Sequence, residues 1–174
     1  AALRSTYEAL VAVGASGTAG EVTRVPAPAK AGVASIIAVG LGEAEEVDDE
    51  TLRRAAGQAA RSINKIEQVA TSLGDFGIAP VVEGLILGGY KYSGLRSEPS
   101  TVPTTFTVVA EKSAQEEFEN AKITAESVLL ARDLVNSPSN LLYPESYAAF
   151  LSAQAAEAGL EVEVLDEKAL EKQG

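Results

Sequence analysis

The chain has 174 residues, which is enough for one well-buried domain and part of a second. Its hydrophobic content of 46% is typical of a folded globular protein, and its net charge of −11 argues against a surface for nucleic acid or anionic membrane. The chain has no Cys and no His, which excludes disulfides, a thiolate nucleophile, and the commonest general base and metal ligand.

Signals for membrane insertion or export are not found in the sequence. No apolar run approaches the roughly 20 residues of a membrane-spanning helix, and the opening AALRSTYEAL lacks the zones of a signal peptide. We therefore expect a cytoplasmic protein. The chain starts without Met and stops at EKALEKQG, so we also expect it to be a fragment of a longer protein.

Strand-like and helix-like segments alternate along the first third of the chain. Short apolar runs that are rich in β-branched residues and end at Gly predict buried strands over 7–14 and 34–40. The polar, turn-rich residues 20–32 between them predict a loop or an edge segment. Apolar residues at helical spacing predict a helix over 48–63, and its acidic first turn suits a helix N-terminus.

The middle of the chain predicts two further strands, over 66–73 and 104–110, with a helix over 79–92 between them. This helix contains three glycines, each of which weakens an isolated helix by roughly 1 kcal/mol. A glycine face would, however, allow the helix to pack closely on a sheet.

The clearest element is a helix over 113–135, which is dense in Ala, Glu, Leu and Lys and about 33 Å long. Five turn-forming residues, 136–140, then break the pattern. A helix over 144–158, a half-buried strand over 161–165 and a helix that starts at 166 follow. Together the segments predict an α/β fold with a mixed, largely parallel sheet flanked by helices, followed by a long connecting helix.

The acidic run EAEEVDDE, residues 43–50, has two interpretations. Its carboxylates could bind a divalent cation, but the run lacks the residue order of a calcium loop. A solvated helix start that is stabilised by the helix dipole is the favoured interpretation.

The glycine-rich stretch GLILGGYKYSG, residues 84–94, invites comparison with phosphate-binding loops. It matches neither the P-loop nor the dinucleotide-binding spacing, so close backbone packing is favoured. Tyr90, Lys91 and Tyr92 could contact a partner or anchor the surface.

Arg132 and Asp133 could form a functional pair, although such residues more often fix a helix to its surroundings. The residues alone give no Ser–His–Asp set and no paired acids in an apolar setting. We therefore assign no catalytic, cofactor-binding or metal-binding residue to this chain.

The segment ARDLVNSPSNLLYPESYA, residues 131–148, resembles the start of the peptidase domain in the leucyl aminopeptidase (cytosol aminopeptidase) family. Three further stretches, 36–61, 81–99 and 159–174, agree with the family in order and spacing. Two positions depart from the family pattern: Ser137 replaces the usual Thr, and Tyr143 replaces a Thr, which removes the expected hydroxyl N-cap. The break at 136–140 is accordingly interpreted as a joint between two structural units, because a residue before Pro disfavours the helical conformation; an ordinary surface turn is the alternative.

The resemblance implies the N-terminal part of a hexameric enzyme that removes N-terminal amino acids from peptides during intracellular protein turnover. The implied domains are a macro-like α/β domain over 1–112, a connecting helix over 113–136 and the beginning of the catalytic peptidase domain over 137–174. The implied cofactors are two divalent metal ions, manganese or zinc, in the catalytic domain. The family's metal-binding motifs are absent from this sequence, so none of its site residues is carried over and the chain alone is expected to be inactive. The alternatives are a stand-alone macro-like module that binds a nucleotide derivative and a purely structural assembly domain.

Overall fold

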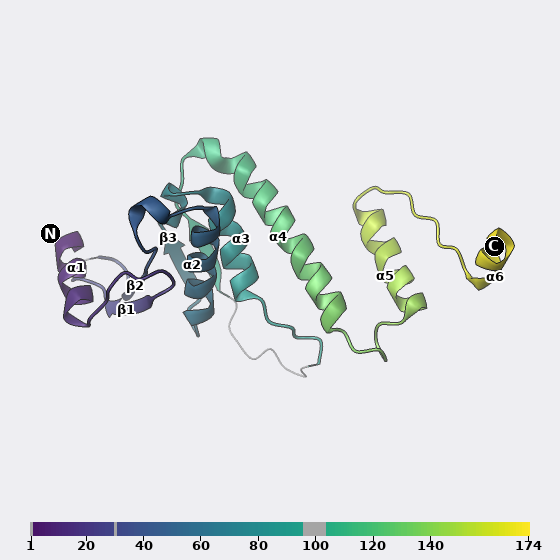
Figure 1. Cartoon of the computed structure of the whole chain (residues 1–174), viewed down its shortest axis with the longest axis horizontal. Coiled ribbons are helices and arrows are strands. Elements are labelled where there is room, and N and C mark those ends of the chain that lie inside the picture. The colour runs from purple at the N-terminus through teal and green to yellow at the C-terminus, as the bar shows by residue number, and fades with distance from the viewer. Residues whose placement is uncertain (1, 30, 96–103) are drawn as a thin grey trace. The chain divides into compact units, whose positions relative to one another are not determined.

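The computed structural model describes residues 2–29, 31–95 and 104–174. The chain divides into two compact units, Ala1–Ala131 and Arg132–Gly174, and each is described by itself (Figure 1). The limit between the units falls inside the long helix. The domain limits expected from the sequence, 112 and 136, stay a prediction.

The first element of unit 1 is a helix, α1 (Ala2–Ala12), so the strand predicted over 7–14 is wrong. Good helix formers fill the segment, and Arg4 and Glu8, four residues apart, form an ion pair of 2.9 Å. The helix ends in a Schellman motif, in which Ala15 N–H donates to Leu10 O and Gly14 takes the left-handed conformation at φ +79°. These local interactions outweigh the β-branched residues on which the strand prediction rested.

The segment predicted as a loop or edge contains a short strand, β1 (Val22–Pro26), which pairs with β2 (Ser35–Val39). The two strands are antiparallel, with Val22 opposite Val39 and Pro26 opposite Ser35. The strand predicted over 34–40 is therefore confirmed. Pro26 lies in β1, which has only one neighbour among the described strands, and an edge strand tolerates a missing N–H.

A short 3₁₀ turn, η1 (Ala44–Glu46), precedes helix α2 (Asp49–Ser62), which confirms the helix predicted over 48–63. Strand β3 (Gln68–Thr71) and the turn η2 (Leu73–Asp75) follow. Helix α3 (Ile78–Gly89) and strand β4 (Thr105–Val108) come next. Strand β3, helix α3 and strand β4 confirm the strand predicted over 66–73, the helix predicted over 79–92 and the strand predicted over 104–110.

Strands β3 and β4 are parallel neighbours, with Gln68 opposite Thr105 and Thr71 opposite Val108. Parallel neighbours need a long crossover, and α3 lies in the connection between them. The described strands thus form two separate two-stranded sheets, one antiparallel and one parallel. The predicted α/β class is confirmed, but the described strands do not join into the single, largely parallel sheet that was expected.

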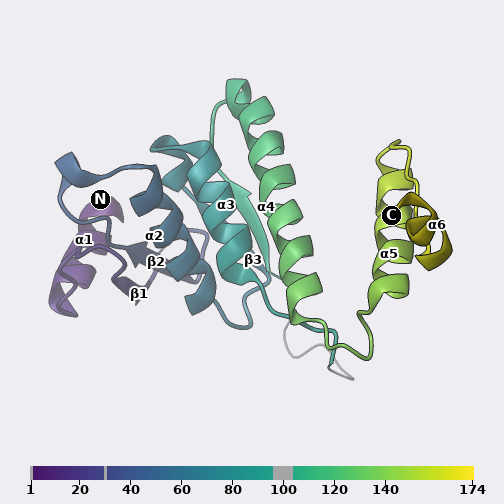
Figure 2. The ribbon, with the colours of Figure 1, turned by 45° about the vertical axis from the view of Figure 1, so that its right-hand side comes forward.

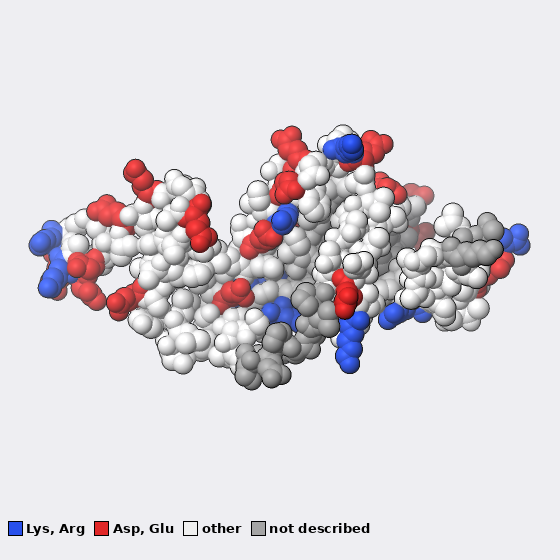
Figure 3. Space-filling model, turned by 180° about the vertical axis from the view of Figure 1, so that it is seen from behind, with Lys and Arg blue, Asp and Glu red and all other residues white. Residues whose placement is uncertain are grey.

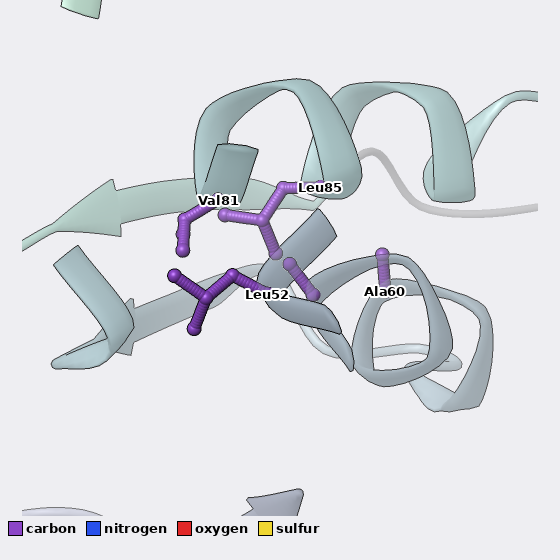
Figure 4. Close-up of a cluster of buried hydrophobic side chains, with 5 residues drawn as sticks. Leu52, Ala60, Val81 and Leu85 are labelled. Carbon is purple, nitrogen blue, oxygen red and sulfur yellow. The ribbon is translucent and has the colours of Figure 1, made fainter. Parts of the chain in front are cut away.

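The main core lies between α2 and α3. Leu52 and Ala60 from α2 face Val81 and Leu85 from α3, and all four side chains are buried (Figure 4). Partly buried residues from neighbouring segments pack against this cluster: Leu41, Val47, Leu73, Phe106 and Val108. The helix pair therefore rests on strand β4.

The long helix predicted over 113–135 is confirmed as α4 (Gln115–Asn136), which follows the turn η3 (Lys112–Ala114). Ala121 packs against Ile78 and Val82 of α3, and the two helices lie side by side in both ribbon views (Figures 1 and 2). The 22 residues of α4 extend past the 12 of α3. Consequently the apolar stripe is buried at Ala121 and Ala125 but exposed at Val128, further along the helix.

Unit 2 contains the end of α4, helix α5 (Pro144–Glu157) and helix α6 (Glu167–Gln173). Both predicted helices are confirmed, and Gly159 at φ +71° closes α5 as expected. The strand predicted over 161–165 is wrong, because the structure has no regular element there and Val162 and Val164 are exposed. A strand gains its hydrogen bonds from a neighbour, and no other part of residues 132–174 pairs with this segment. Within the described residues, no helix is long and apolar enough to cross a membrane.

Candidate functional site

The acidic run 43–50 is the start of α2. Asp48 is the N-cap, and its carboxylate accepts hydrogen bonds from the Thr51 hydroxyl at 2.7 Å and the Thr51 backbone N–H at 2.8 Å. These bonds, led by the one from the hydroxyl, hold the pKa of Asp48 below its ordinary value. The interpretation as a capped helix start is thus confirmed.

Another carboxylate of the run is already engaged by arginines. Glu50 accepts from Arg54 and Arg53, each at 2.7 Å, and these bonds lower its pKa. Glu43, Glu45 and Glu46 are exposed. Across the described parts of the chain, no three His, Cys, Asp or Glu side chains are grouped so that they could hold a metal ion.

The glycine-rich stretch 84–94 serves helix packing. A Cβ on Gly84 would lie 2.3 Å from the Arg53 carbonyl oxygen, and a Cβ on Gly88 would lie 2.5 Å from the Gly57 Cα. Only glycine therefore allows α3 to approach α2 this closely. The predicted close backbone packing is confirmed, but its partner is helix α2 and not a sheet.

The last residues of that stretch lie beyond the helix. α3 ends at Gly89, and Lys91 is exposed while Tyr90 and Tyr92 are half-buried. The ring and hydroxyl of Tyr92 lie against Gly94. This arrangement is that of a surface segment, and it forms no phosphate-binding loop.

An ion pair links α2 to α3 beside the glycine contact. Arg53 donates to Glu83 at 2.7 Å and also reaches Glu50 at 2.7 Å, so one guanidinium bridges two helices. The hydrogen bond to Glu83, and next the one to Glu50, raises the pKa of Arg53. The two side chains are partly buried, with exposed fractions of 33% for Arg53 and 20% for Glu83, and their ion pair joins α2 to α3.

A first feature that the sequence did not reveal is an open hollow of about 470 Å³ between α3 and α4. It is lined by acidic, amide, hydroxyl and small side chains: Ala79, Glu83, Ser113, Glu116, Glu117, Asn120, Ala121 and Thr124. Because the two helices lie far apart in sequence, no local motif could have predicted it.

One carboxylate of the hollow has a structural task. Glu117 of α4 accepts a hydrogen bond of 3.1 Å from the backbone N–H of Ala79, in the first turn of α3. The N-cap of α3 is Gly77, which has no side chain to offer, so Glu117 supplies the negative charge that a helix N-terminus favours. Glu83 is bound to Arg53.

A second unpredicted feature is a tight loop before β1. Glu21 accepts from the Ser16 hydroxyl at 2.8 Å, from Ser16 N–H at 2.9 Å and from Gly17 N–H at 2.8 Å. The Ser16 bonds are the main cause of the lowered pKa of Glu21. Gly17 and Gly20 take the left-handed conformation at φ +78° and +81°, and these glycines are a sequence signal for the loop.

Charge is dispersed on one face of the molecule. On the face shown in Figure 3, acidic side chains are scattered among neutral ones with basic side chains between them. Arg132 and Asp133 are exposed near the end of α4. That this chain carries no catalytic residue stays a prediction.

The break at 136–140 ends α4 as predicted. The helix stops at Asn136, two residues before Pro138. The Ser137 hydroxyl donates to Asp133 O at 2.7 Å, and Leu141 N–H donates to Pro138 O at 2.9 Å, which closes a turn. The limit between the two compact units lies just before this turn, between Ala131 and Arg132.

Helix α5 has Tyr143 at its N-cap, where the family pattern has Thr. No hydroxyl N-cap is available, but the Ser146 hydroxyl accepts from the Tyr143 backbone N–H at 3.0 Å. In a capping box, the side chain of the third helical residue accepts from the N-cap backbone in this way. The backbone N–H of Tyr143 therefore has a hydrogen-bond partner.

Solved structures of other proteins share the fold of this chain. The structure titled "Bottromycin maturation enzyme BotP" matches with a TM-score of 0.85 and 27% identity, over 95% of this chain and 37% of that one. The cytosol aminopeptidase from Coxiella burnetii matches with a TM-score of 0.71 and 20% identity, over 96% of this chain and 34% of that one. The chain therefore shares the fold of about a third of each of these two proteins.

Sequence comparison identifies the family. A family model described as "Cytosol aminopeptidase family, N-terminal domain" matches residues 5–99. A probable cytosol aminopeptidase of Corynebacterium diphtheriae is 53% identical over 97% of this chain and 35% of its own length. One from Nocardia farcinica is 48% identical over 95% of this chain and 35% of its own length. The chain belongs to the cytosol aminopeptidase family, and it spans about a third of the length of these curated relatives.

Proposed function

We propose that this chain is the N-terminal part of a dimetal leucyl aminopeptidase that removes N-terminal amino acids from peptides in the cytoplasm. The observation that carries the proposal is the match of residues 5–99 to the N-terminal domain of the family. Relatives about three times longer, which align over nearly all of this chain, support a further domain that performs the chemistry.

The proposed metal centre lies outside this chain. The described residues do not fit a metal centre, because their acidic side chains are not grouped. Asp48 caps helix α2, and Glu50 is bound to Arg54. We therefore assign no step of the reaction to the residues of this chain. The proposed cofactors are two divalent metal ions, manganese or zinc, and binding of such an ion is supported by BotP, of which one structure is titled as a complex with Mn and is 28% identical to this chain.

The role that we assign to the chain itself is scaffolding and assembly of a homo-oligomer, with a hexamer as the expected form. The side chains of unit 1 support this role: the buried ones within the described ranges are all hydrophobic, the Arg53–Glu83 contact joins two helices, and Glu117 caps the start of α3. Buried, unpaired ionisable groups, which often mark a reactive site, are not among the residues described.

An activity assay tests this proposal directly. Hydrolysis of leucine p-nitroanilide is measured with added manganese or zinc, for the 174-residue chain and for the full protein encoded by its source gene. We expect turnover by the full protein and only the metal blank for the chain. Turnover by the chain above the blank would overturn the scaffolding role, and an inactive full protein would overturn the aminopeptidase assignment.

A titration separates the scaffolding role from binding of a nucleotide derivative. ADP-ribose is added to the chain in a calorimeter, and we expect no heat beyond dilution. Saturable binding would contradict a role that is limited to scaffolding.

A further inference from the structure

We draw no further inference here: the strongest candidate, the open acidic hollow between α3 and α4, carries nothing, because two of its carboxylates already bind Arg53 and the backbone N–H of Ala79 and no second feature of the described residues points to a ligand.

Discussion

The contact between α2 and α3 depends on the absence of two side chains. Gly84 and Gly88 lie one helical turn apart on α3, and each would direct a Cβ at the backbone of α2. A backbone atom cannot rotate away as a side chain can. The substitutions Gly84→Ala and Gly88→Ala must therefore push the helices apart, which weakens the packing of Leu52 against Val81 and Leu85.

Two opposing effects set the size of the change. Alanine is better than glycine inside a helix by roughly 0.5–1 kcal/mol. Overpacking of a well-packed contact costs about 1–3 kcal/mol, and the clashes of 2.3 Å and 2.5 Å favour the upper part of that range. Each variant should thus lose about 1–2 kcal/mol of unfolding free energy, which corresponds to a melting temperature lower by about 2–8 °C.

Two other glycines provide matched controls. A Cβ on Gly89, at the exposed end of the same helix, meets nothing within 4 Å, so Gly89→Ala should be as stable as the wild type or more stable. A Cβ on Gly57 of α2 would lie 3.4 Å from the Gly84 carbonyl oxygen, with the movable Arg61 guanidinium next. Gly57→Ala should therefore fall between the control and the two destabilised variants.

Urea unfolding of the 174-residue chain, followed by far-UV circular dichroism, measures the series. The midpoints should rank Gly89→Ala first, then Gly57→Ala, with Gly84→Ala and Gly88→Ala last, at a constant slope. If Gly84→Ala and Gly88→Ala unfold at the same urea concentration as Gly89→Ala, the glycines do not set the distance between the helices and the argument fails.

Three further predictions concern other parts of the chain. The double variant Asp48→Asn, Asp49→Asn keeps a capping side chain, so its melting temperature should equal that of the wild type with or without calcium or manganese. If either cation raises the melting temperature of the wild type but not of the variant, residues 43–50 bind a metal ion and the interpretation as a helix start alone is wrong. Folding lowers the pKa of Glu21 from its ordinary 4.5, so its stabilising effect is complete above that value and disappears as the pH falls through the lower folded pKa. The melting temperatures of the wild type and Glu21→Gln should accordingly converge on acidification, and a constant difference would contradict the role of the Ser16 contacts. Brief protease treatment should cut at or after Asn136 and leave the N-terminal piece intact; equal resistance of residues 144–174 would contradict the two-unit description.

Helices were predictable from the sequence because their signals are local. The spacing of Leu52, Ala56 and Ala60 along α2 identified its buried face, and Asp48 identified its start. Similarly, Pro144 and Gly159 marked the two ends of α5. Each of these features lies within one or two turns of the residue that reveals it.

Short apolar runs were harder to interpret. Residues 7–14 and 161–165 both contain alternating Val, but neither forms a strand. The first run lies in a longer segment whose Arg4–Glu8 pair and Gly14 cap favour a helix. The second lacks a neighbouring strand, and strand pairing is a non-local property that five residues cannot encode.

The candidate site was predictable in its local parts only. The acidic run 43–50 was correctly interpreted as a helix start, and the close packing at Gly84 and Gly88 was expected, although on the wrong partner. The hollow and the Glu117 cap on α3 were not found, because they require α4 to lie beside α3. Ala121 of α4 packs on Val82 of α3, and the residues next to either one in sequence do not predict this contact.

The buried core and the segment 131–148, which carries the most specific resemblance in the sequence, lie in different parts of the chain. The buried hydrophobic side chains of the described residues all lie in unit 1, between Val25 and Ala125. Unit 2 has none, and its helices rely on local caps such as Ser146 and Asp166. An isolated helix as short as α5 is marginal in water, so unit 2 should open well before the α2–α3 core does. The segment 131–148 therefore lies mostly in the unit that should open first, whereas residues 5–99, which match the family model, include most of the packed core.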